Sequence, residues 1–160
     1  VLFRSQSHVG TIDIATIFAA ASEGNFSLLK SSMDVLKFPL TFADENGYTL
    51  LHAASSYNQI EILKFLLKEL DRSSINCTNY INAGDNEGDS ALHYAGSADV
   101  ARILVEDGRI NTTNVNSHGK TPLQAKKAEL LEMMNDEDTQ EDDEDIELVQ
   151  NLIEYLSGLA

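Results

Sequence analysis

DENGYTLLHAA (residues 44–54) is the stretch that decides the fold, because similar segments begin at residues 85 and 116, as DNEGDSALHYA and NSHGKTPLQAK. Aligned on their glycines, Gly47, Gly88 and Gly119, the three segments are 41 and 31 residues apart. Self-similarity at a period of about 20–50 residues is typical of proteins built from stacked repeats. Each segment is therefore either a repeated structural unit or a repeated chemical site.

The residues of one unit predict a turn, a short helix, a reversal and a longer helix. Gly47 suits the turn, and Thr49 suits the N-cap of the short helix. Asn58 is expected to adopt a left-handed conformation at the reversal. Apolar residues then recur at helical spacing over residues 60–67. Because one helix pair cannot bury its apolar face alone, stacking of neighbouring units is expected to complete the core.

The three segments resemble the ankyrin-repeat signature, which is Thr-Pro-Leu-His-x-Ala after a β-turn. The matching residues are TLLHAA (49–54), SALHYA (90–95) and TPLQAK (121–126). The third departs most, with Gln124 in place of His and Lys126 in place of Ala. The resemblance implies an all-α fold, an ankyrin-repeat solenoid of about four stacked helix-turn-helix repeats with β-turn tips.

The chain is predicted to divide into four units after a short leading segment. Residues 1–10 are expected to be disordered or foreign to the fold. The predicted units are an N-terminal capping repeat (11–43), a repeat with an extended loop (44–84), a shortened repeat (85–115) and a C-terminal capping repeat (116–160) with an acidic insertion at 135–145. In the shortened repeat, about three residues are expected to be missing from the turn between the two helices.

The histidines at matching positions suggest either a metal pair or a general base, or else a helix cap. His52 follows Thr49 by three residues, which is the spacing of a capping box. Gln124 holds the same position in the third segment. Gln can replace a His that only makes hydrogen bonds more easily than it can replace a His that acts as a catalytic base. The residues predicted to be structural are Thr49, His52, Ser90, His93, Thr121 and Gln124. No catalytic, metal-binding or cofactor-binding residue is predicted, and the chain is not expected to be an enzyme.

The ankyrin resemblance implies that the chain binds another protein through its turn tips and the exposed side of its first helices. Tyr48 and Tyr57 are the preferred anchors, because aromatic residues dominate binding energy at interfaces. Packing within the repeats is an equally open alternative for both rings. The predicted partner-binding residues are Glu45, Asn46, Tyr48, Ser56, Tyr57, Asn86, Glu87, Asp89, Ser117, His118 and Lys120.

The charge is strongly negative and unevenly distributed. The net charge is −15, and residues 131–160 contain eleven acids with no Lys or Arg. This balance argues against direct nucleic-acid binding, which needs a basic surface. Residues 136–145 contain eight acids, and they form either a solvated insertion or a docking strip for a basic protein.

The sequence therefore predicts two main candidate functions and one less favoured candidate. The first is a non-catalytic protein-protein interaction module or adaptor. The alternative is an acidic escort for a very basic protein such as a ribosomal protein, and less favoured is a regulatory part of a longer enzyme chain. The single cysteine, Cys77, excludes an internal disulfide and favours a reducing compartment. With no apolar run long enough to span a membrane, we expect a cytoplasmic and/or nuclear monomer.

Overall fold

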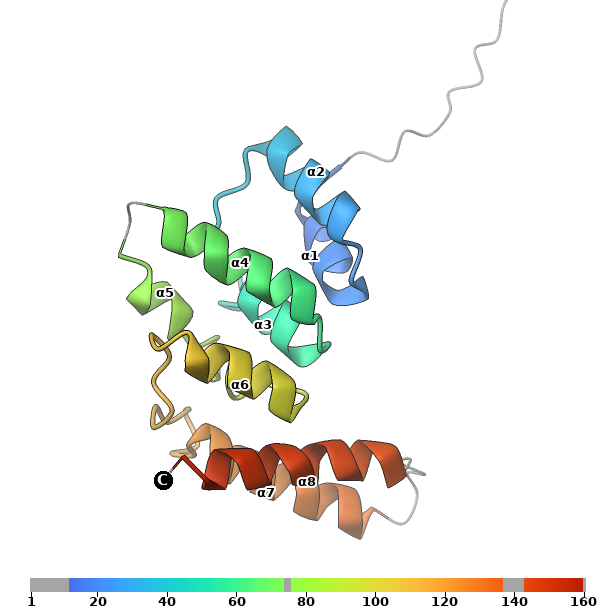
Figure 1. The fold of residues 1–160 in the computed structure, drawn as a ribbon, viewed down its shortest axis with the longest axis vertical. Helices are drawn as coiled ribbons and strands as arrows, with labels where there is room; N and C mark the ends of the chain where they lie inside the picture. Colours follow the sequence, from blue (N-terminus) through green and yellow to red (C-terminus); the bar gives the residue numbers. More distant parts are fainter. Residues whose placement is uncertain (1–11, 74–75, 137–142, 160) are drawn as a thin grey trace, which may run out of the picture.

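The computed structural model describes residues 12–73, 76–136 and 143–159, and every regular element within them is a helix. Helix pairs are stacked along the long axis of the molecule, from α1 and α2 at one end to α7 and α8 at the other (Figure 1). This arrangement confirms the predicted all-α solenoid. The helices are α1 (Ile14–Glu23), α2 (Phe26–Leu36), α3 (Leu50–Ser56), α4 (Ile60–Arg72), α5 (Thr78–Ile81), α6 (Ala98–Glu106), α7 (Pro122–Asn135) and α8 (Asp143–Ser157).

Local sequence signals determine where most helices begin and how closely they pack. Asp13, Thr49 and Thr121 each cap a helix through a reciprocal capping box. Asn58 has a φ of 55°, so the expected left-handed reversal separates α3 from α4. Alanine pairs in α1 and α3 are fully buried, which lets neighbouring helices approach closely. The leucines of α4, which are Leu63, Leu66, Leu67 and Leu70, are buried in the core.

The third unit differs from the expectation, because its first helix is lost and not merely the following turn. Residues 91–94 form turns, and the next helix, α6, begins at Ala98. The backbone N–H of Gly96 donates to the carbonyl of Ser55 at 3.1 Å, so the chain docks directly on the end of α3. A Cβ on Gly96 would lie 2.9 Å from the carbonyl oxygen of Ser56. Glycine therefore permits the short connection that replaces the helix.

The extended loop of the second unit contains ordered structure of its own. The short helix α5 lies within it, and Ile81 and Cys77 are both buried against the core. The Sγ of Cys77 lies 3.2 Å from the hydroxyl of Ser73. The additional residues therefore extend the core.

α7 and α8 form the last helix pair of the described residues. The first turn of α8 carries Asp143, Glu144 and Asp145, where negative charge favours the helix N-terminus. Residues 137–142, the centre of the predicted insertion, lie outside the described residues, as does the predicted leading segment 1–10. In the part that is described, no helix is long and apolar enough to cross a membrane.

Candidate partner-binding surface

Three turns with the same hydrogen bonds form one side of the molecule, and we call them the tips (residues 44–48, 85–89 and 116–120). In the first tip, the Oδ1 of Asp44 accepts the backbone N–H groups of Asn46 and Tyr48 at 2.8 and 2.9 Å. Asp85 and Asn116 make the equivalent pairs of bonds in the second and third tips. The side-chain oxygen that opens each tip therefore fixes its conformation before any contact with another unit.

Hydrogen bonds also join each tip to the next. The N–H of Asn86 donates to the carbonyl of Asn46, and the N–H of Ser117 donates to that of Glu87, both at 2.8 Å. Gly47 and Gly88 have φ values of 74° and 77°, and a Cβ on either would lie 3.0 Å from the backbone of the following tip. The glycines thus supply both the left-handed turn and the close approach. The three tips form a continuous hydrogen-bonded edge.

His52 caps its own helix and binds the next unit. Its Nδ1 accepts the N–H of Thr49 at 3.0 Å, so the neutral ring carries its proton on Nε2. Nε2 donates to the carbonyl of Asp89 at 2.8 Å. Burial lowers the pKa of His52 below its usual value, which keeps the ring neutral near pH 7. The ring is buried and both of its nitrogens are hydrogen-bonded, which favours a structural interpretation of His52.

The other two capping positions support the same interpretation. His93 repeats the arrangement, accepting from the N–H of Ser90 at 3.1 Å and donating to the carbonyl of Lys120 at 3.0 Å. Gln124 lies in the last helix pair of the described residues, and there it makes the cap, accepting the N–H of Thr121 through Oε1 at 2.9 Å.

A cluster of aromatic rings connects the first and second tips to α3. The Tyr48 ring stacks on His52 with centroids 5.3 Å apart, and Tyr94 meets both rings edge-on. The hydroxyl of Tyr94 donates to Oδ2 of Asp85 at 2.6 Å. Burial raises the pKa of Tyr48 to about 12, and burial together with the Asp85 hydrogen bond raises the pKa of Tyr94. Tyr48 is half-buried in this cluster, so packing within and between repeats accounts for most of its ring.

The predicted partner-binding residues differ in exposure. Tyr57, at the end of α3, is 59% exposed, which leaves its ring available to a partner. Tyr48, Ser56 and Asp89 are half-buried. The remaining predicted positions are exposed on the tips: Glu45, Asn46, Asn86, Glu87, Ser117, His118 and Lys120.

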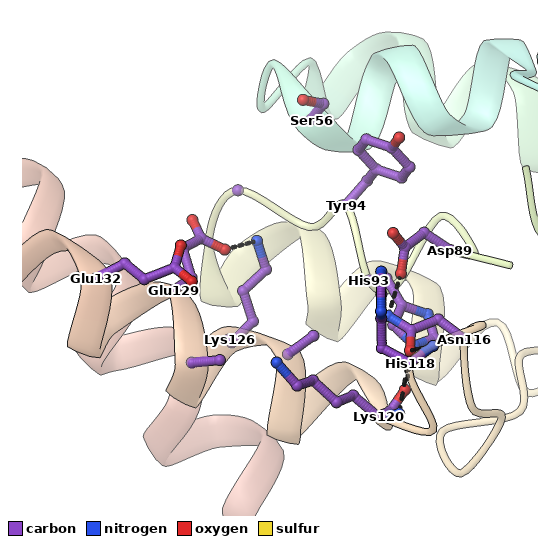
Figure 2. Close-up of a pocket in the computed structure, with 13 residues that line it drawn as sticks. Ser56, Asp89, His93, Tyr94, Asn116, His118, Lys120, Lys126, Glu129 and Glu132 are labelled. Atoms are coloured by element: carbon purple, nitrogen blue, oxygen red, sulfur yellow. Dashed lines mark hydrogen bonds and ion pairs between the residues drawn. The ribbon is translucent and has the colours of Figure 1, made fainter. Parts of the chain in front are cut away.

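A groove that the sequence reasoning missed lies where the third unit lacks its first helix. It has a volume of about 450 Å³ and runs between Ser56 of α3, the segment around Tyr94 and Gly96, and one face of α7 (Figure 2). Lys126 projects into it from α7. The available signal was Lys126 itself, because a long side chain at a position that normally needs Ala indicates that the neighbouring helix is missing.

The described residues show no group of three His, Cys, Asp or Glu side chains placed to hold a metal ion. The polar atoms of the two capping histidines are occupied by the hydrogen bonds described above. The surface therefore offers backbone turns, exposed polar side chains and one exposed ring, which are groups suited to contacts with another macromolecule.

Comparison with known proteins gives a consistent result. The family model for ankyrin repeats (3 copies) matches residues 16–116. The ankyrin repeat-containing protein P1E11.10 of Schizosaccharomyces pombe is 31% identical over 112 residues, which is 70% of this chain and 50% of the relative. The ankyrin repeat and SOCS box protein 3 of Bos taurus is 34% identical over 97 residues, which is 59% of this chain and 17% of that protein. The chain thus spans half the length, or less, of these curated relatives.

Among solved structures, a chain in the crystal structure of the yeast ribosomal protein Rps3 in complex with its chaperone Yar1 is similar to this one. The TM-score is 0.65 and the sequence identity 24%, and the match covers 80% of this chain and 95% of that chain. At this identity the likeness supports the fold.

Proposed function

This chain belongs to the ankyrin-repeat family, and we propose that its protein partner binds along the tips and at the accessible C-terminal end of α3, where Ser56 and Tyr57 lie. Ankyrin repeats are protein-interaction modules, typically without catalysis. The observation that carries the proposed location is the hydrogen-bonded edge, which holds three sets of exposed polar side chains at fixed spacing, together with the exposed Tyr57 ring at the C-terminal end of α3. A rigid surface loses little conformational entropy on binding, which favours affinity.

The test compares partner capture by three immobilised chains: the unmodified protein, Tyr57→Ala and Val35→Ala. Val35 is exposed on α2, away from the proposed surface, so it is a matched control for loss of an exposed apolar side chain. We expect the affinity for the captured partner to fall by about thirtyfold with Tyr57→Ala and to stay unchanged with Val35→Ala. Equal affinity for all three chains, together with no loss in an Asn46→Ala/Asn86→Ala double variant, would contradict the proposed surface.

A second candidate function is escort of a very basic protein, and the charge distribution favours it. The net charge is −15, with eight of the acids within residues 136–145. The similar chain in the Rps3 structure comes from a complex of a ribosomal protein with its chaperone. In this case the acidic segment would attract the partner over a distance of about 10 Å or less at physiological salt.

Salt dependence separates the two candidates. An escort is expected to lose affinity steeply between 0.05 and 0.5 M NaCl, and to lose it also when the acids at 136–145 are changed to Asn and Gln. A variant with the same acids in scrambled order is the control, because it keeps the charge and should keep the binding. If the affinity does not change with salt or with neutralisation of the acids, but falls when Tyr57 is replaced, the adaptor function is supported and the escort function is contradicted.

The remaining parts of the proposal concern catalysis, oligomeric state and cellular location. We infer that the chain is a non-catalytic monomer in the cytoplasm and/or nucleus. Its single cysteine, which is buried, supports a reducing compartment. The capping histidines support the absence of catalysis, because both ring nitrogens of each are engaged in hydrogen bonds. A regulatory role within a longer enzyme chain stays the less favoured alternative. Light scattering of the purified chain gives the oligomeric state directly.

A further inference from the structure

The groove described above separates this chain from a regular stack of helix pairs. The first helix of the second unit is α3, and the first helix of the fourth unit is α7. Between them the third unit presents only the turns at residues 91–94 and the segment held on α3 by Gly96. A partner that lies along the tips and first helices therefore meets a depression of about 450 Å³ at this level.

Lys126 shows which chemistry the groove accommodates. Its side chain is only 8% exposed, and its Nζ lies 2.7 Å from Oε2 of Glu129. The groove thus already holds a long alkyl stem ending in a cation against a carboxylate. Glu129 itself is 45% exposed, so its carboxylate remains accessible from the solvent side.

Further acceptors surround the open part of the groove. Glu132 lies one turn beyond Glu129 on the same face of α7, and Asp89 approaches from the second tip (Figure 2). Tyr94 contributes a half-buried aromatic ring whose hydroxyl is held by Asp85. The cations that face the groove are Lys120, Lys126 and, when protonated, His118. Lys126 donates to Oε2 of Glu129, so Oε1 of Glu129 and the carboxylate of Glu132 can accept from a second cation.

We propose that the groove binds an arginine side chain presented by the protein partner, with its guanidinium on the neighbouring carboxylates of Glu129 and Glu132. Arginine fits better than lysine, because its planar group can donate to two carboxylate groups at once. This inference rests on the proposed function and deepens it, since it assigns one side chain of the partner to one position on the surface.

The test uses a small probe in place of the partner: N-acetyl-arginine methylamide, with N-acetyl-citrulline methylamide as its neutral isostere. Both are titrated into the isotopically labelled protein while amide chemical shifts are followed by NMR. We expect saturable shifts at Tyr94, Gly96 and Glu132 with the arginine probe, at roughly millimolar concentration, and at least fivefold weaker binding of the citrulline probe. Glu132→Gln should weaken arginine binding by about fivefold, whereas Glu61→Gln, an exposed neutralisation on α4, should not.

A second variant tests shape without changing charge. Ala128 lines the groove, so Ala128→Phe should fill it and remove the arginine-dependent shifts. The inference is wrong if the two probes bind equally, if Glu132→Gln and Glu61→Gln behave alike, or if the shifts lie only outside the groove. Such a failure would leave the proposed function intact, because partner capture and its dependence on Tyr57 are measured without the probe.

Discussion

His52 joins two repeats through the two nitrogens of one ring. Nδ1 caps α3, and Nε2 donates to the carbonyl of Asp89 in the next unit. Gln124 makes the cap alone, in the last helix pair that the structure describes. The chain therefore contains its own comparison between a side chain that caps and bridges and a side chain that only caps.

That comparison predicts graded losses of stability. We expect His52→Ala to lower the free energy of unfolding by about 3 kcal/mol, because it removes both bonds and leaves buried space. His52→Gln should cost roughly 1–2 kcal/mol, since it retains the cap and loses the bridge. Gln124→Ala, the exposed control, should cost about 1 kcal/mol. Urea denaturation of the three variants measures the order, and equal losses for the two His52 variants would contradict the bridging role.

The same residue gives a pH dependence whose sign follows from its pKa. Burial lowers the pKa of His52 in the folded state, so the unfolded chain takes up its proton first as pH falls below about 6.5. The stability contributed by the neutral ring is present above that pH and is lost below it. Between pH 7.5 and 5.5 we expect the wild-type protein to lose up to about 1 kcal/mol more than His52→Gln. Unfolding curves at both pH values check this, and parallel losses would contradict it.

At the scale of the element, the third unit shows how a helix can be omitted from a stack. The backbone of Gly96 bonds to Ser55 where a whole helix would otherwise intervene. Lys126 then extends into the space that remains and pairs with Glu129. The deletion is accommodated by one residue without a side chain and one with a long side chain.

Gly96 is predicted to be sensitive for this reason. In Gly96→Ala the new methyl group would lie 2.9 Å from the carbonyl oxygen of Ser56, so α3 or the connection must shift. We expect a loss of about 1–3 kcal/mol in unfolding free energy, measured by thermal or urea denaturation. Gly158→Ala is the matched control, because its nearest contact would be 3.4 Å and we expect a change of less than about 0.5 kcal/mol. Similar small changes at both positions would show that the docking at Gly96 is loose.

Local signals predicted much of this fold, and contacts between units account for what was missed. Thr49, Thr121 and Asn58 reveal caps and a reversal because each acts within four residues of itself. The shortened segment after Ser90 revealed a deletion, but sequence spacing does not say whether a turn or a helix is lost. The groove depends on two elements separated by the missing helix, so Lys126 was its one visible sign. The partner-binding residues themselves stay a prediction.

At the scale of the whole molecule, the charge of −15 acts on every unit at once. Self-repulsion among acids destabilises a compact state, and salt screens it. We expect the unfolding free energy to rise by about 1 kcal/mol between 0.05 and 0.5 M salt. NaCl and KCl should have the same effect if screening is the cause. A fall in stability with salt would show instead that attractive ion pairs such as Arg109–Asp107 dominate.

The hydrogen bonds from tip to tip continue unchanged past the level where the helix is missing. The spacing of the tips is therefore set by their own backbone and is independent of how much helix stands behind each one. The side chains on the tips do not depend on the depth of the groove between α3 and α7, so mutation can alter one while the other is preserved. A scaffold of this kind allows the side chains of a recognition surface and the depth of its grooves to be redesigned in separate steps.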